Sequence, residues 1–218
     1  MTGNSNDVLV VPKLSIYNVR QNEDIILNNV AIDPDYARDS DGKVLYFDYN
    51  EGRSFLAEQG KSIPSLPLLV NLYIVLNELA AENELAARVV AQLNSAWDRT
   101  STFVNPSGTI SHSDSVLGNI TVEGLEIPRK GLGISELFDD NERFFQALLG
   151  VRDIARLSEV AEQNNRAPFY WYPRGERWTM FGGGDFYYMH MYIPNLLMVF
   201  CDDEVHPRRI LRGVWQEK

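Results

Sequence analysis

Apolar residues recur at helical spacing through the middle of the chain. Between residues 65 and 97 they fall three and four positions apart, and the polar run AENE interrupts them once. Ser65 can cap the first turn, and Pro67 lies within that turn, where a missing N–H costs nothing. The pattern predicts two helices, or one helix with a bend.

Three more helices are expected, one before this pair and two after it. Asn50 is a possible N-cap for a helix that runs through Glu58 and ends before Gly60. A longer segment from Ser135 to Gly150 carries apolar residues on one side, with glycine in the place of a C-cap. A helix from Asp153 to Gln163 follows it.

Strand-like pieces occupy the rest of the chain. A hairpin is expected from the segments Asp24–Asp33 and Lys43–Tyr49, with the turn sequence DSDG between them. Three short strands are expected between Arg99 and Pro128, and the pieces FYWY, ERWTMF, LLMVFC and RRILRGVW extend the β pattern toward the end. Because helices and strands come in blocks without regular βα alternation, the order predicts an α+β fold, taken as one domain over residues 1–218.

Composition narrows the classes of function. A net charge of −10 argues against binding to nucleic acid, because that affinity comes mainly from Lys and Arg. The single cysteine, Cys201, excludes an internal disulfide, and no cofactor is expected. The chain shows neither a secretory signal nor a membrane span, so a cytoplasmic location is expected unless a partner exports or displays the protein.

Three short motifs offer catalytic residue types. The sequence CDDEVH supports an alternative reading as a hydrolase or metal-dependent enzyme that uses Cys201, His206 and Asp202 or Asp203, although a strand end followed by an acidic turn is favoured. Ser111–Ser115, SHSDS, contains the residue types of a triad but is favoured as a polar turn. The sequence FGGGDF lacks the following helix that a phosphate-binding loop requires.

The segment from Pro168 to Phe200 is unusually aromatic, with eleven of the 24 Phe, Tyr and Trp residues of the chain. Its ends, Trp178–Phe181 and Leu196–Leu197, are expected to be sheet core, and Gly182–Gly184 a backbone turn that releases the chain. In DFYYMHMYIPN no alternation sends all large apolar groups to one face. This stretch is therefore expected to be a contact surface. A strand buried on both faces and an oligomer contact remain as alternatives, as does a structural subunit of a larger assembly.

The sequences FFQALLGVRDIARL, FYWYPRGERWTMFGGGDF and RRILRGVW together resemble the variable proteins of diversity-generating retroelements, in a divergent subclass of archaeal or viral origin. In this resemblance Gly182–Gly184 stand for the glycine motif before the diversified positions, and Leu211, Arg212 and Gly213 for the closing motif. It implies a single C-type lectin-like domain with a variable region at about residues 170–215. It also implies a binding protein for a protein or cell-surface ligand, not an enzyme, with an oligomer possible. The implied ligand-binding residues are Asp185, Phe186, Tyr187, Tyr188, Met189, His190, Met191, Tyr192 and Asn195.

Overall fold

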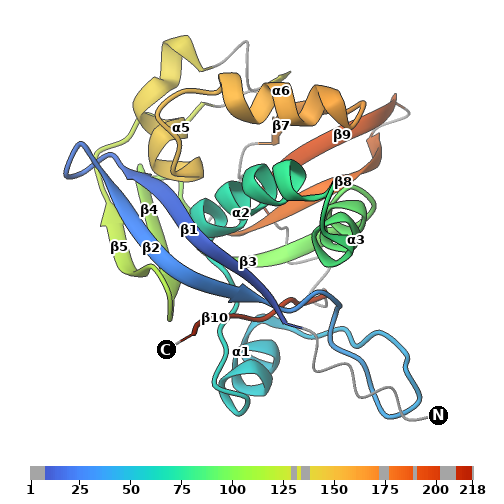
Figure 1. The fold of residues 1–218 in the computed structure, drawn as a ribbon. Helices are drawn as coiled ribbons and strands as arrows, with labels where there is room; N and C mark the ends of the chain where they lie inside the picture. Colours follow the sequence, from blue (N-terminus) through green and yellow to red (C-terminus); the bar gives the residue numbers. More distant parts are fainter. Residues whose placement is uncertain are drawn as a thin grey trace.

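A computed structural model describes residues 8–128, 132–133, 138–171, 177–188, 191–201 and 210–217. It confirms the predicted α+β class: a three-stranded sheet, a seven-stranded sheet and a group of helices (Figure 1). Among the helices in these ranges, none is both long enough and apolar enough to cross a membrane.

The small sheet joins strands from opposite ends of the chain. Strands β1 (Leu9–Asn18) and β2 (Glu23–Ile32) form an antiparallel hairpin, and β10 (Val214–Gln216) pairs with the other edge of β2. The two ends of the described chain are therefore held together in one sheet.

The predicted hairpin between Asp24–Asp33 and Lys43–Tyr49 is wrong, because the first segment pairs with β1 instead. The DSDG sequence does turn the chain, since the Asp39 carboxylate accepts a hydrogen bond from the Lys43 N–H and an isolated bridge joins Arg38 to Val44. The residues after the bridge do not form a strand. Phe47 and Tyr49 instead pack against a small core of Leu56, Ile63 and Leu211.

The large sheet has the strand order β5-β4-β3-β8-β9-β7-β6, and its neighbours are antiparallel except for β7 and β9. The three strands expected between Arg99 and Pro128 are present as β3, β4 and β5. The strands are β3 (Trp97–Asn105), β4 (Thr109–Asp114), β5 (Gly118–Val122), β6 (Leu132–Gly133), β7 (Ala167–Trp171), β8 (Arg177–Tyr188) and β9 (Met191–Cys201).

The helices begin and end for local reasons that the sequence shows in part. Two separate helices form around AENE, which is the first of the two arrangements predicted for this segment. Gly150 ends its helix in the left-handed conformation at φ 65°. The first helix is capped by Asp48, not Asn50, in a capping box with Glu51. Ser135, the predicted start of the segment that Gly150 ends, lies outside the described residues. The helices are α1 (Tyr49–Ala57), α2 (Leu66–Leu79), α3 (Glu84–Leu93), α5 (Glu142–Leu149), preceded by the 3₁₀ turn η1 (Asp139–Asn141), and α6 (Ala155–Gln163).

Helix α2 is the centre of the molecule. It contacts β1 of the small sheet, β3 and β8 of the large sheet, and the helices α3, α5 and α6 (Figure 1). Most of its residues are buried, which explains why its apolar positions run nearly all round the helix instead of along one stripe. One face of the large sheet is thereby covered by helices.

Candidate functional site

The hairpin of β8 and β9 contains the predicted contact residues. The two strands pair from Thr179 opposite Cys201 out to Tyr188 opposite Met191, with an irregularity after Gly184. Met189 and His190 lie outside the described residues. For residues 185–188 and 191–194 the structure describes the backbone alone.

The outer part of this hairpin extends past its neighbours. Strand β3 pairs with β8 only up to Gly182, and β7 pairs with β9 only from Leu196 onward. Within the described residues, positions 185–188 and 191–195 therefore pair only with each other, and we call these positions the ribbon. In Figure 1, β8 and β9 run together toward the side of the molecule where α3 and the end of α6 lie.

The glycines before the ribbon are strand interior, so the expectation of a turn at Gly182–Gly184 is wrong. The segment between α3 and β3 crosses directly against them. A Cβ on Gly183 would lie 2.5 Å from the carbonyl oxygen of Asn94, and one on Gly182 would overlap the carbonyl of Ala96. Positions 182 and 183 require glycine because two backbones approach there too closely for any side chain.

The inner part of the hairpin is core, as predicted. Phe181, Leu196 and Leu197 are buried, and the Phe181 ring meets the ring of Tyr73 on α2 edge-on at 5.5 Å. Asn195 marks the change to the ribbon: its side chain is exposed, and its backbone is left-handed at φ 59°. Of the predicted site residues, Asn195 is the one whose side chain the structure describes.

A network of side-chain amides lies against the base of the ribbon. Asn94 accepts a hydrogen bond from the Tyr73 hydroxyl at 2.8 Å and donates one to Asn164 at 2.9 Å. Asn164 in turn donates to Asn77 at 2.6 Å, and Arg166 donates to the Asn94 carbonyl at 2.6 Å. The network ties the C-terminal ends of α2, α3 and α6 together. No pattern in the sequence predicts this network; the one local signal is that Asn94 and Asn164 are both C-cap residues.

The predicted closing motif, Leu211 to Gly213, has a structural role through its arginine. Arg212 is fully buried, and its guanidinium donates to the buried Asp98 carboxylate at 3.1 Å, to the Gln92 side chain and to the Asp33 carbonyl at 2.7 Å each. Its guanidinium carbon lies 4.7 Å from the centre of the Tyr36 ring. Burial raises the pKa of Asp98, and the charge of Arg212 opposes that rise. This pair fixes the segment before β10 to β3 of the large sheet.

The expectation of a polar turn at SHSDS is correct only for its end. Ser111–Asp114 are the last residues of β4, and the turn begins at Ser115, where the Asp114 carboxylate accepts hydrogen bonds from the N–H groups of Val116 and Leu117. His112 is buried on β4: its Nδ1 lies 2.8 Å from the Thr102 hydroxyl, and its Nε2 lies 2.9 Å from the carbonyl of Ala147. Burial lowers the pKa of His112 to about 4, so the ring is neutral at pH 7. Asp114 accepts a hydrogen bond from the Ser65 N–H at 2.9 Å, at the start of α2. These residues connect structural elements and do not form a triad.

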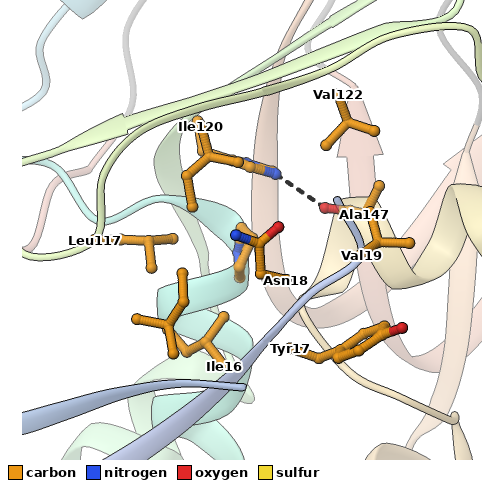
Figure 2. A pocket seen from close by; sticks show the side chains of 11 residues that line it. Ile16, Tyr17, Asn18, Val19, Leu117, Ile120, Val122 and Ala147 are labelled. Carbon is orange, nitrogen blue, oxygen red and sulfur yellow. Dashed lines mark hydrogen bonds between the residues drawn. The ribbon is translucent and has the colours of Figure 1, made fainter. Parts of the chain in front are cut away.

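A small crevice lies beside His112, between the β1–β2 hairpin and the strands β4 and β5 (Figure 2). Its lining is mainly apolar, with side chains such as Ile16, Leu117 and Ile120. The dashed line in Figure 2 marks the hydrogen bond between the His112 ring and the Ala147 carbonyl. Because the other ring nitrogen faces Thr102, His112 offers no free catalytic group there.

The residues of the enzyme alternative are not brought together by the described structure. Cys201 ends β9, as expected, while Asp202, Asp203 and His206 lie outside the described residues. Within the described ranges, no group of three or more His, Cys, Asp and Glu side chains could hold a metal ion.

Comparison with known proteins finds no matching protein-family model, no similar curated protein and no similar solved structure. The fold defines the structural class of the protein as α+β. The features that point to a function are the geometry of the β8–β9 hairpin and the sequence of the ribbon.

Proposed function

We propose that this protein is a non-enzymatic, receptor-like binding protein whose contact surface is the ribbon together with Met189 and His190. The observation that carries the proposal is the extension of the ribbon beyond β3 and β7. A two-stranded hairpin is marginal in water by itself, and its open edges invite pairing with another chain. Four of the eleven residues 185–195 are aromatic and only Asp185 carries a full charge, a composition suited to contact and not to solvation.

The base on which the ribbon stands supports a surface that tolerates change. The crossing at Gly182 and Gly183 and the Asn94–Asn164 hydrogen bond fix the inner hairpin without using any ribbon side chain. In this proposal the scaffold is C-type lectin-like and the ribbon is its diversified part, as the sequence resemblance implies. The buried Arg212 supports the same reading, because a closing motif that holds the scaffold has to stay constant.

The binding proposal is tested with a random-peptide library panned against the whole chain. Peptides enriched on the protein are then measured against the variant Y187A/Y188A/Y192A. A matched control is V8A/I26A/Y46A, which removes three exposed apolar side chains elsewhere. We expect the ribbon variant to lose more than about tenfold in affinity with its Tm within a few degrees, and the control variant to bind as the parent does.

Two results would overturn the proposal. Peptides that bind the ribbon variant and the parent equally would place the contact surface elsewhere. A ribbon variant that fails to fold would make the three tyrosines core residues.

Diversification has a separate test at the level of DNA. We expect a near-copy of the coding sequence for residues 170–215 beside a reverse transcriptase gene, with differences mainly at adenines. If the source genome holds no such copy, the ribbon is a fixed binding surface and the retroelement reading is wrong, while the peptide-binding test stands unchanged.

A further inference from the structure

We propose that Asn94 is a positioning residue for the ribbon: it clamps the chain segment that crosses Gly182 and Gly183 and thereby fixes the direction in which the ribbon extends. This inference rests on the proposed function, because it names the residue that prepares the proposed contact surface for its ligand. Such a clamp matters because, within the described residues, the ribbon has no other strand beside it.

The ribbon begins at a point where the strand pair can bend. Three consecutive glycines, Gly182–Gly184, precede it on β8, and glycine has more backbone freedom than any other residue. On β9 two residues, Pro194 and Asn195, stand opposite the single Asp185 of β8, and the backbone of Asn195 is left-handed. This is the arrangement of a β-bulge, which bends a strand and changes its direction. The direction of the ribbon is therefore decided at its base.

The segment between α3 and β3 lies across these glycines. A Cβ on Gly183 would lie 2.5 Å from the carbonyl oxygen of Asn94 and 2.9 Å from its Cα, so the contact is backbone against backbone. Helix α3, which ends directly before Asn94, also contacts β8 (Figure 1). Among the described residues, β3 pairs with β8 no further out than Gly182. Asn94 therefore supports β8 just before the ribbon begins.

Asn94 is itself held from three sides. Its side-chain oxygen accepts a hydrogen bond from the hydroxyl of Tyr73 on α2 at 2.8 Å, and its side-chain nitrogen donates to Asn164, the C-cap of α6, at 2.9 Å. Its carbonyl oxygen accepts a hydrogen bond from the guanidinium of Arg166 at 2.6 Å. The crossing segment cannot lift from the glycines without breaking bonds to α2, to α6 and to the residue before β7.

A ribbon with a fixed direction should bind more tightly than a mobile one. A surface that already has its bound orientation loses less conformational freedom when the ligand arrives. A two-stranded hairpin is marginal in water by itself, so its order has to come from its base. Loosening Asn94 should therefore weaken binding although every ribbon residue remains in place.

Distances between pairs of spin labels test the clamp without a ligand. In a Cys201→Ser background, one pair joins position 188 in the ribbon to the exposed position 58 at the end of α1. A second pair joins position 58 to the exposed position 123 after β5 and reports on the scaffold. The clamp variant is Y73F/N94A, which removes both partners of one hydrogen bond and so leaves no buried tyrosine hydroxyl unpaired. We expect the 58–188 distance to lose its single narrow distribution in this variant, and the 58–123 distance to stay as in the parent.

Asn71→Ala is the matched control on the same helix. The Asn71 side chain is buried and donates hydrogen bonds to the carbonyls of Pro67, Leu149 and Gly150. Its loss should lower the Tm, as the clamp variant does, while the 58–188 distribution stays as in the parent. A general loss of stability is thereby separated from a loss of position. An unchanged 58–188 distribution in the clamp variant, or the same broadening in Asn71→Ala, overturns the proposal.

Peptides enriched on the whole chain, and weakened by Y187A/Y188A/Y192A, measure the consequence for binding. We expect their affinity to fall about three- to tenfold in Y73F/N94A and to stay within about twofold of the parent in Asn71→Ala. An unchanged affinity beside a broadened distance overturns the positioning role and leaves the proposed function intact. Peptides that ignore the ribbon overturn the proposed function, and the distances then confirm or overturn the clamp by themselves.

Discussion

The inner and outer halves of the β8–β9 hairpin have the same secondary structure and opposite surroundings. The inner half lies between β3 and β7, with buried Phe181 and Leu197 and a glycine crossing that leaves no room for a side chain. The outer half pairs only with itself among the described residues. What separates the scaffold from the proposed contact surface is therefore the set of neighbouring strands and not the secondary structure itself.

The largest effect is expected from Arg212→Met, on the side that holds the scaffold together. Removing the guanidinium leaves the buried Asp98 carboxylate without its charge partner, which should cost about 3–5 kcal/mol of unfolding free energy in a urea titration. Arg88→Met is the control, because its pair with Asp35 is partly exposed and should contribute less than about 1 kcal/mol. Adding Asp98→Asn to Arg212→Met should recover part of the loss. Equal effects of the two arginine variants would contradict the central position of the Arg212 pair.

A pH-dependent effect is expected at His112, far from the ribbon. Its pKa is about 4 in the folded protein against about 6.5 when unfolded, so the unfolded chain binds the proton first as pH falls. The stability contributed by the neutral ring is thus complete above about pH 6.5 and is lost toward pH 4, by roughly 3 kcal/mol in all. His112→Gln should flatten this part of the curve of unfolding free energy against pH. Parallel curves for parent and variant would show that other groups cause the slope.

A smaller effect is expected where the two halves of the hairpin meet. Gly183→Ala forces the Asn94 backbone to move and should cost about 1–3 kcal/mol in thermal or urea unfolding. The neighbour Gly184→Ala is a matched control, because its nearest contact would be the Trp97 ring nitrogen at an ordinary 3.5 Å. We expect this control within about 0.5 kcal/mol of the parent. If both variants unfold alike, the close crossing does not define the boundary.

Local patterns in the sequence predicted the elements whose neighbours lie close along the chain. The helix pair around AENE, the three strands after Arg99 and the glycine at position 150 needed only spacing and caps. The predicted pairing of Asp24–Asp33 with Lys43–Tyr49 was wrong because Lys43–Tyr49 does not form a strand, and the first segment pairs with β1, whose inward positions are mainly apolar.

The parts that could not be predicted depend on contacts between distant segments. Arg212 and Asp98 are 114 residues apart, and no local pattern links them. Glycines at 182 and 183 look like a turn until the segment after α3 is placed against them. In the sequence, His112 is a residue type found in catalytic triads. In the structure, both of its ring nitrogens are hydrogen-bonded, one to Thr102 and the other to Ala147. The ribbon could be predicted as unusual in composition, but its extension past β3 and β7 follows only from the register.

The smallest effect on stability is expected within the ribbon, at the facing pair Tyr187 and Tyr192. A double-mutant cycle of the two alanine substitutions should give a coupling below about 1 kcal/mol, because a cross-strand pair at a free end contributes little beyond its own contact. Urea unfolding measures the coupling, and Phe181→Ala on the buried half provides the contrast, with a loss of about 3–5 kcal/mol. A ribbon pair that costs as much as Phe181 would mean that the outer half is packed like the inner one, and that the contrast between scaffold and contact surface does not exist.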